Sequence, residues 1–308
     1  MSNINKIMKN KKPRKLRKNL ILIILLLINT NHNLLKLEKE RLILKNIYYS
    51  EMFEHLRKVK TKGDKYVISI IIPVYNEEKT IRKILNDLPK NKDIEIIVID
   101  DHSLDNSVKE IEEVKKQHAI KLIRHNKNQG YGRAILMGIK NSQGNVIVTM
   151  DSDGQHSPED IYSLVKPILE KEADFTIGSR YLGRYHYNLP ITTRFGEVII
   201  EKLIHILYGQ KITNNQNGFR AFNRNIIKIF DDIHYHGYAF ATELVLKAMI
   251  YGYVIKECPI SVYSREYGSS GIILNVLALN IFSCFVRYFV KNIKMLTKRK
   301  IRILNRKK

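Results

Sequence analysis

The sequence predicts an α/β protein in which helices cover both faces of a mostly parallel central sheet. From Tyr66 onward, short runs rich in isoleucine and valine alternate with segments whose apolar residues recur at helical spacing. Polar or acidic residues follow most of these runs, where the carboxyl ends of parallel strands meet along one edge of a sheet. This alternation is typical of a parallel sheet whose crossover connections are helices.

The first three predicted strands are β-branched runs separated by two helices. Apolar residues from Ile81 to Leu88 recur at helical spacing, and the run Asp105-Asn106-Ser107 is suited to begin a second helix. Pro73 has no N–H to donate and is expected to end the first strand. The predicted strands are residues 67–72, 94–99 and 120–123.

Glycines and a proline mark the elements that follow. Gly130 and Gly132 precede a helix expected at residues 133–140. Ser157 and Pro158 suit the N-cap and the first position of a helix, which predicts a helix over residues 158–171. Two further strands are predicted, at residues 146–150 and 175–177.

Two carboxylates, Asp151 and Asp153, follow the fourth predicted strand. Residues two apart in an extended chain point to the same side, so these side chains are expected to lie together. Two such carboxylates repel each other unless a cation lies between them, and oxygen ligands favour Mg²⁺ or Mn²⁺. Gly154 permits a sharp turn, and Gln155 adds a further polar group. The alternative interpretation is that both aspartates are only turn residues.

The basic character of the chain belongs to its two ends. The chain has 308 residues and a formal net charge of +23. Residues 1–18 hold eight Lys and Arg residues and residues 291–308 hold nine, with no acidic residue in either tail, which leaves +6 for the middle. Basic ends are typical of binding to nucleic acid or to an anionic membrane, or of solubilising tails. Two cysteines offer no disulfide framework or metal-site spacing, which fits a reducing compartment.

Two apolar segments flank the predicted sheet region. Leu20 to Ile28 is shorter than the roughly 20 residues that span a membrane, and we expect a membrane-surface or packing helix there rather than a cleaved signal. Residues 34–60 have a charged helical pattern. Ile272 to Val286 carries no charge, and polar residues at helical spacing continue beyond it, which predicts an interfacial helix. Packing of this helix on the domain or on a partner is the alternative.

Arginines suited to binding a phosphate group lie further along the chain. Four stand in polar segments marked by glycine or proline, namely Arg180, Arg194, Arg220 and Arg265. For any one of them, a surface salt bridge is the alternative. Asp100 ends the second strand, where it could hydrogen-bond a base or a ribose. The glycine-rich signatures of dinucleotide-binding folds and of phosphate-loop NTPases are absent from the sequence.

Seven motifs occur in the order and spacing of family 2 glycosyltransferases. Within that family the chain resembles the dolichyl-phosphate mannose and glucose synthases, over about residues 66–270. The motifs are IIIPVYNEE (70–78), VIDDHSLDNS (98–107), NQGYGRAILMGI (128–139), MDSDGQHSPED (150–160), GSRY (178–181), NGFRAF (217–222) and SREYGSS (264–270).

The resemblance implies a GT-A fold and an inverting, metal-assisted transfer of a hexose from a nucleotide-sugar to polyprenyl or dolichyl phosphate. The donor would be of the GDP-mannose or UDP-glucose type. The residues implied for nucleotide-sugar binding are Pro73, Tyr75, Glu77, Asp100 and Asp151. Those implied for Mg²⁺ or Mn²⁺ are Asp151, Asp153 and Gln155. The catalytic set is Asp151 and Asp153, with Arg180, Arg194 and Arg265 to receive the acceptor's phosphate.

The resemblance also divides the chain and suggests where it works. We expect a basic N-terminal extension (1–62), a catalytic domain (63–270), and a membrane-interface helix with a basic tail (271–308). The expected location is peripheral, at the cytoplasmic face of a membrane. A membrane partner subunit stays open, and no nucleic-acid partner is expected.

Two positions depart from the family pattern. Asn214 stands where many members have an acid, four residues before the glycine of the Gly-Phe-Arg motif, and Gly271 stands where many have a lysine. The first change puts a catalytic base at that position in doubt. A lipid phosphate needs no such base, because it is already an anion near neutral pH and can attack the anomeric carbon directly.

Three other functions remain open from the sequence. A family 2 enzyme that acts on a sugar hydroxyl, for glycolipid or polysaccharide synthesis, is the first. A non-enzymatic binder of nucleic acid or anionic membrane would account for the tails but leaves the acidic cluster unexplained. A nucleotidyltransferase also uses paired acids, but its glycine-rich phosphate loop is missing from the sequence.

Overall fold

The computed structural model describes residues 34–305 apart from 186–190, 238, 266 and 268–273. Clustering of contacts divides the chain into two compact units, Met1–Glu51 and Met52–Lys308. Helix α3 (Leu34–Val59) confirms the helix expected at residues 34–60. The apolar run 20–28, the basic tail 1–18 and Gly271 lie outside the described residues.

A seven-stranded mixed sheet forms the centre of the second unit. The strands are β1 (Ile68–Val74), β2 (Ile94–Asp100), β3 (Ile120–Arg124), β4 (Val146–Thr149), β5 (Phe175–Tyr185), β6 (Arg220–Asn223) and β7 (Ile255–Val262). Their order across the sheet is β3-β2-β1-β4-β6-β5-β7. Only β6 runs antiparallel to its neighbours, so the prediction of a mostly parallel sheet is confirmed.

Strand β1 forms the middle of the parallel half because its side chains are buried on both faces. All seven residues are buried, as expected for a β-branched run between two strands and under two helix layers. The prediction that Pro73 ends this strand is wrong, since β1 continues to Val74. Strand β4 pairs with β1 only as far as Ile71, so Pro73 lies where β1 has a strand partner on one side only.

Helices alternate with the first five strands as expected, whereas the helical segments between residues 191 and 251 were not predicted. They are α4 (Ile81–Asp87), α5 (Ser107–Lys115), α6 (Tyr131–Lys140), the 3₁₀ turn η1 (Pro158–Asp160), α7 (Ile161–Leu169), α8 (Ile191–Tyr208), the 3₁₀ segment η2 (Arg224–Phe230), α9 (Phe240–Tyr251) and α10 (Leu274–Asn305). The helix predicted over 158–171 is therefore a 3₁₀ turn continued by α7. Ser157 is its N-cap, although its side chain makes no capping hydrogen bond.

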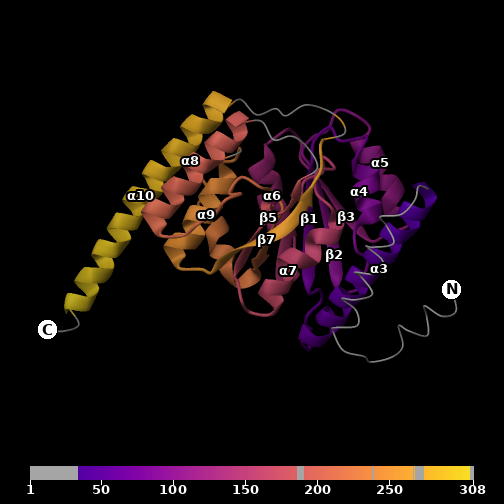
Figure 1. Ribbon diagram of the computed structural model, residues 1–308, viewed down its shortest axis with the longest axis horizontal. Helices are drawn as coiled ribbons and strands as arrows, with labels where there is room; N and C mark the ends of the chain where they lie inside the picture. The colour runs from indigo at the N-terminus through magenta and orange to yellow at the C-terminus, as the bar shows by residue number, and fades with distance from the viewer. Residues whose placement is uncertain (1–33, 186–190, 238, 266, 268–273, 306–308) are drawn as a thin grey trace. The chain divides into compact units, whose positions relative to one another are not determined.

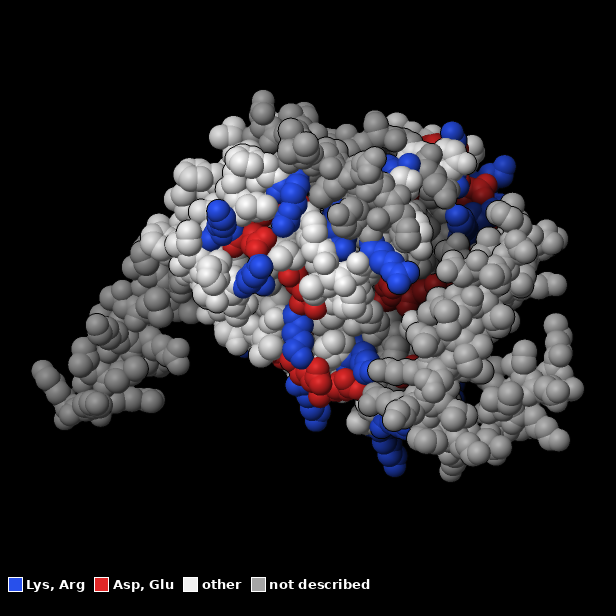
Figure 2. Space-filling model, in the orientation of Figure 1, with Lys and Arg blue, Asp and Glu red and all other residues white. Residues whose placement is uncertain are grey.

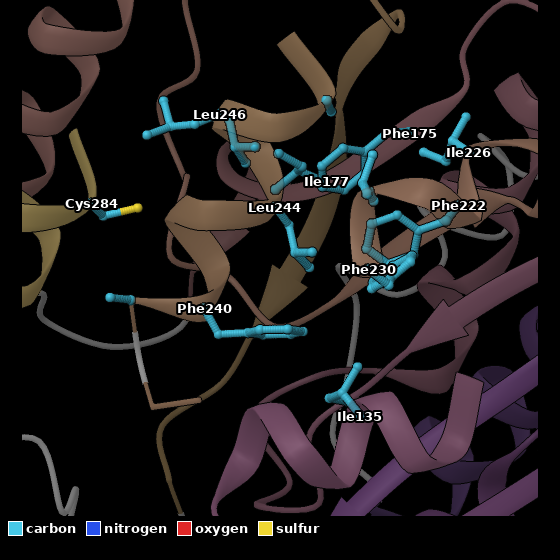
Figure 3. Packing of buried hydrophobic residues seen from close by; sticks show 14 of the residues in the cluster. Ile135, Phe175, Ile177, Phe222, Ile226, Phe230, Phe240, Leu244, Leu246 and Cys284 are labelled. Carbon is cyan, nitrogen blue, oxygen red and sulfur yellow. The ribbon is translucent and has the colours of Figure 1, made fainter. Parts of the chain in front are cut away.

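One hydrophobic cluster joins the sheet to the last three helices. Phe175 of β5 stacks on Phe222 of β6 with ring centroids 4.5 Å apart, and Phe230 meets Phe222 edge-on at 5.0 Å. Figure 3 shows these rings beside Leu244 and Leu246 of α9. Ile281, Cys284, Phe285 and Tyr288 of α10 belong to the same cluster. In Figure 1, α8, α9 and α10 lie together beyond β5, on the opposite side of the second unit from α4 and α5.

Charged side chains on the described surface are mixed in sign. On the face drawn in Figure 2, lysine and arginine side chains lie beside aspartate and glutamate side chains. Ion pairs such as Lys256 with Glu172 (2.8 Å) and Lys116 with Glu113 (2.7 Å) have the same character. Within residues 34–305, as far as they are described, none of the helices has the length and hydropathy needed to cross a membrane.

Candidate active site at the carboxyl ends of the central strands

Asp151 lies just beyond the carboxyl end of β4. Its Oδ1 atom is buried and accepts no hydrogen bond from the described residues, and Nδ1 of His156 lies 3.8 Å from its Oδ2. Burial raises the pKa of Asp151, His156 opposes the shift, and the neighbouring Asp153 adds to it. A buried carboxylate oxygen without a hydrogen-bond donor is a chemically suitable ligand for a cation.

Gly218 and Tyr131 form the other side of the space around Asp151. A Cβ atom on Gly218 would lie 2.5 Å from each Asp151 carboxylate oxygen and 2.7 Å from the Tyr131 hydroxyl. The absence of a side chain at Gly218 is therefore what lets these groups meet. Burial, and then the charge of Asp151, raises the pKa of Tyr131 well above its usual value, so the hydroxyl stays protonated and acts as a donor at neutral pH.

Asp153 belongs to a second charged group, which it forms with Glu77 and Arg265. Nη2 of Arg265 lies 2.9 Å from Oε1 of Glu77 and 3.7 Å from Oδ2 of Asp153. Burial raises the pKa of Glu77, Arg265 lowers it, and Asp153 raises it further. The structure thus brings together three residues that lie far apart in the sequence.

The turn after Asp153 is held by hydrogen bonds to the Asp153 side chain and to Tyr263. The Gln155 N–H donates to Oδ1 of Asp153 at 3.0 Å, and Gly154 adopts a positive φ of 81°. Nε2 of Gln155 donates to the carbonyl of Tyr263 at 3.2 Å, which ties the turn to the end of β7. The amide nitrogen of Gln155 is therefore engaged with Tyr263, whereas the role predicted for Gln155 at the metal stays a prediction.

The residues predicted to bind the nucleoside lie at the ends of β1 and β2. Asp100 is buried, accepts the Ser103 N–H at 3.1 Å, and lies 3.2 Å from Nε of Arg124. Pro73 is buried inside β1, whereas the Tyr75 ring is 45% exposed, which leaves it available to a ligand.

Asp101, which the sequence did not single out, holds the loop before α6. Its carboxylate accepts hydrogen bonds from Nδ1 of His125 at 2.7 Å, from Gln129 N–H at 2.8 Å and from Gly130 N–H at 2.7 Å. These bonds orient the glycine turn that precedes Tyr131. The sequence signal, two adjacent aspartates at a strand end, did not show which of the two supports the loop.

The other two predicted arginines lie further along the second half of the fold. Arg180 lies in β5. Arg194, near the start of α8, stacks 4.1 Å from the centroid of the Tyr181 ring and lies 4.0 Å from Glu201. Burial, and then Glu197, raises the pKa of Tyr181 to about 12. Arg265 therefore contacts the acidic pair through Asp153, whereas Arg194 contacts Tyr181 and Glu201.

Arg220 is a supporting residue rather than a phosphate ligand. It is 2% exposed and donates to the backbone carbonyls of Asn217 (2.6 Å), Ala241 (2.9 Å) and Asn215 (2.5 Å). Burial lowers its pKa to about 10, and Asp151 opposes that shift. Asn214 is fully buried and donates from Nδ2 to the Gly178 carbonyl at 3.3 Å.

The acidic pair fits a hard divalent ion with an incomplete protein ligand set. Within the described part of the chain, no group of three or more His, Cys, Asp or Glu side chains is arranged to hold a metal. Asp151 and Asp153 offer oxygen ligands, and Asp151 Oδ1 lacks a hydrogen-bond donor. Mg²⁺ and Mn²⁺ are commonly held by one or two carboxylates, with water and substrate phosphate oxygens completing the shell.

A protein-family model matches the part of the chain that contains the acidic pair. The model of the family "Glycosyl transferase family 2" matches residues 69–230, which include β1, β4 and the acidic pair. This range begins and ends within the region where the sequence motifs lie.

Curated relatives match over most of their length. An uncharacterized protein of Methanocaldococcus jannaschii is 34% identical over 66% of this chain and 84% of its own. The UDP-N-acetylglucosamine–dolichyl-phosphate N-acetylglucosaminyltransferase of Methanococcus voltae is 32% identical over 65% of this chain and 87% of its own. A dolichol-phosphate mannosyltransferase of Pyrococcus furiosus is 29% identical over 66% of this chain and 58% of its own.

Solved structures share the fold at low sequence identity. Glucosyl-3-phosphoglycerate synthase of Mycobacterium tuberculosis, in complex with Mn²⁺, UDP and glucosyl-3-phosphoglycerate, has a TM-score of 0.59 at 17% identity, over 76% of this chain and 83% of that one. Its complex with Mg²⁺ and UDP has a TM-score of 0.58 at 16% identity over the same shares. The likeness supports the GT-A-like architecture expected from the sequence.

Proposed function

Because the chain belongs to glycosyl transferase family 2, we propose that it transfers a sugar from a nucleotide-sugar to the phosphate of a polyprenyl or dolichyl phosphate. Two relatives carry dolichyl or dolichol phosphate in their names. They differ in the sugar, which is N-acetylglucosamine in one and mannose in the other. UDP-N-acetylglucosamine therefore joins GDP-mannose and UDP-glucose among the candidate donors.

The observation that carries the proposal is the contact of Arg265 with the acidic group at the strand ends. A phosphate acceptor must approach a donor diphosphate that is also an anion, so a cation beside the metal ligands is needed. Nη2 of Arg265 lies 3.7 Å from Asp153 and 2.9 Å from Glu77. On binding, the acceptor phosphate would replace one of these carboxylates as a partner of the planar guanidinium.

Of the remaining site residues, some would bind the donor and others the acceptor. Asp151 and Asp153, with Gln155, would hold a divalent ion, which neutralises the departing diphosphate when it is bound. Asp100 and Tyr75 would contact the nucleoside, and Arg180 and Arg194 would extend the acceptor site. The buried amide of Asn214 fits a reaction without a carboxylate base at that position, because an anionic phosphate attacks directly with inversion at the sugar.

Helix α10 supports a membrane location for this chemistry. Leu279 and Phe282 on it are 69% and 65% exposed, and Val286, Phe289 and Val290 are also exposed. Arg287 and Lys291 lie next to this apolar stripe on the helix, and further basic residues follow. An exposed apolar stripe beside cations is the arrangement by which interfacial helices bind anionic lipid. The proposed location is the cytoplasmic face of a membrane, with the protein held peripherally.

A donor panel tests the proposal directly. The full chain would be incubated with membranes or short polyprenyl phosphate and with labelled GDP-mannose, UDP-glucose, UDP-galactose or UDP-N-acetylglucosamine. The expected result is label from one donor in a solvent-extractable, acid-labile product, abolished by EDTA. Transfer to a sugar hydroxyl, with none to the lipid phosphate, would overturn the acceptor assignment and favour glycolipid or polysaccharide synthesis.

A further inference from the structure

We propose that Glu243 is a positioning residue which couples helix α10 to the donor site through Tyr131 and Asp151. Glu243 lies in the first turn of α9 and is fully buried. It touches neither the acidic pair nor Arg265 in any contact described above. The meaning of this coupling for catalysis rests on the proposed function, whereas the coupling itself rests on contacts within the fold.

The Glu243 carboxylate joins three separate segments. The Tyr288 hydroxyl of α10 donates to its Oε1 at 2.5 Å. The backbone N–H groups of His234 and Tyr235, in the loop before α9, donate to the carboxylate at 3.0 and 2.9 Å. Nδ1 of His234 lies 3.4 Å from the same Oε1. A buried carboxylate that accepts several bonds fixes the groups that donate to it, because each would otherwise be left unsatisfied.

The loop that Glu243 holds is in contact with the start of α6. The carbonyl of His236 accepts the Gly132 N–H at 2.8 Å, which satisfies one of the free donors at that helix N-terminus. A Cβ atom on Gly132 would lie 2.9 Å from this carbonyl oxygen and 3.0 Å from the Cα of His236, so glycine is needed for the approach. A displacement of the loop would therefore displace the first turn of α6.

Tyr131 carries the connection from α6 to Asp151. It is the residue before Gly132, and its hydroxyl faces the Asp151 carboxylate across Gly218. Its ring packs edge-on against Phe240 of α9, with centroids 6.3 Å apart, three residues before Glu243. Thus α9 sets the place of Tyr131 both through the ring and through the loop. Displacements near 1 Å are sufficient to change catalytic rates greatly.

Hydrogen exchange tests the coupling without any ligand. Tyr288→Phe removes the hydroxyl that reaches Glu243 and keeps the ring in the core. Ser283→Ala is the matched control, because it removes the 2.8 Å contact between Ser283 Oγ and the Tyr235 hydroxyl, which joins the same helix to the same loop. We expect amides of residues 130–134 to exchange about tenfold faster in Tyr288→Phe, and at the unaltered rate in Ser283→Ala.

A double-mutant cycle then tests the path through Tyr131. Affinities for UDP and for GDP, each with Mn²⁺, are measured by calorimetry in the unaltered protein, in Tyr288→Phe, in Tyr131→Phe and in the double variant, and the nucleotide that the unaltered protein binds more tightly is compared. We expect Tyr288→Phe alone to weaken binding about tenfold, and to have no further effect in the Tyr131→Phe background. Additive effects, or faster exchange spread equally over all peptides of Tyr288→Phe, would overturn the proposal. No lipid acceptor enters either measurement, so failure of the lipid-phosphate assignment leaves both results interpretable.

Discussion

Asp151 and Asp153 occupy two different environments although one residue separates them. Asp151 faces a buried tyrosine and a glycine, whereas Asp153 contacts Arg265 beside Glu77. The charge of each carboxylate is therefore balanced differently before any ligand binds. A divalent ion between them would replace the stabilisation that Asp151 lacks, and the donor diphosphate would complete its shell.

Loss of the Asp153 charge is expected to reduce transfer severely. Asp153→Asn keeps the size of the side chain but weakens the metal site and leaves Arg265 with one carboxylate partner fewer. Turnover should fall at least about 100-fold, close to 3 kcal/mol. Steady-state assays with a Mn²⁺ titration measure it. Glu113→Gln, which removes a surface carboxylate paired with Lys116, is the control and should leave turnover unchanged. Full activity of the unaltered protein in EDTA would contradict the metal role.

A side chain at Gly218 is expected to displace Asp151. The Cβ atom of Gly218→Ala would lie 2.5 Å from both carboxylate oxygens, closer than real contacts allow. Affinity for UDP with Mn²⁺ should fall about 100-fold in calorimetry. Gly196→Ala is the matched control, because a Cβ there meets nothing within 4 Å, and its affinity should be unaltered. Normal binding by Gly218→Ala would show that Asp151 does not contact the ion.

Replacement of Arg265 by lysine tests whether the site needs the planar guanidinium or only a positive charge. Lysine keeps the charge but has no planar pair of donors, so it cannot hold Glu77 or Asp153 and an acceptor phosphate together. We expect the apparent KM for polyprenyl phosphate to rise about tenfold, while donor affinity stays within about twofold. Arg82→Lys, at an exposed pair with Glu110, controls for the change of residue type. A rise confined to the donor KM would assign Arg265 to the donor half instead.

The sequence indicates the charged residues of the candidate site more readily than the uncharged residues packed around them. Asp151 and Asp153 follow a recognisable strand and stand two positions apart in the chain, so local pattern suffices. Tyr131 begins α6 and Gly218 precedes β6, so their place beside Asp151 depends on how the chain packs rather than on nearness in the sequence. Both residues lie within family motifs, NQGYGRAILMGI and NGFRAF, but the local pattern alone does not reveal that they meet at Asp151.

At the scale of elements, tertiary contacts explain why β6 and α9 were not predicted and why the end of β5 was misplaced. Strand β6 has only four residues, and helix α9 is buried almost all round, so neither shows the period of an amphipathic element. Strand β5 extends to Tyr185, well beyond the predicted residues 175–177, and β7 pairs with it on both sides of an irregularity between Ser179 and Arg184. Tertiary partners, rather than local propensity, set these bounds.

The junction between η1 and β7 should respond to pH. Oδ2 of Asp160 accepts the Ser261 N–H at 2.7 Å. Burial raises the pKa of Asp160 from 3.8 to about 6, Ser261 opposes the shift, and Glu159 adds to it. The native state therefore binds a proton that the unfolded chain has lost between these values. Stability contributed by Asp160 falls as pH rises through this window, and the loss persists above pH 6.

Asp160→Asn should consequently raise the stability of the protein only where the native aspartate is charged. Urea unfolding at pH 7.5 is expected to show a higher midpoint for the variant, since its neutral amide still offers an oxygen to Ser261. Near pH 4, where Asp160 is protonated, the two midpoints should agree. A variant that is less stable at pH 7.5 would indicate that the charged carboxylate is favourable at this junction.

At the scale of the whole molecule, one side of α10 packs in the core and another side is exposed. Phe285 and Tyr288 on one side are buried in the cluster shared with α9, whereas Leu279 and Phe282 on another side are exposed. The sequence predicted an amphipathic interfacial helix, with packing on the domain as the alternative. Because one helix carries both faces, removal of residues 272–308 would expose the core as well as remove the apolar stripe.

Substitution of the outer stripe alone therefore separates membrane docking from folding. Each large apolar side chain transferred from water contributes about 1.5–3 kcal/mol, so three polar replacements should abolish most binding to lipid. We expect Leu279→Gln, Phe282→Gln and Phe289→Gln combined to lose binding to anionic vesicles at least about tenfold, measured by sedimentation. Transfer to a short, detergent-soluble polyprenyl phosphate should continue near the unaltered rate. Asn280→Ala, on the polar side of α10, is the control and should bind vesicles normally. Unchanged sedimentation of the triple variant would mean that the stripe does not contact lipid, and that a protein partner or the basic tail holds the chain at the membrane.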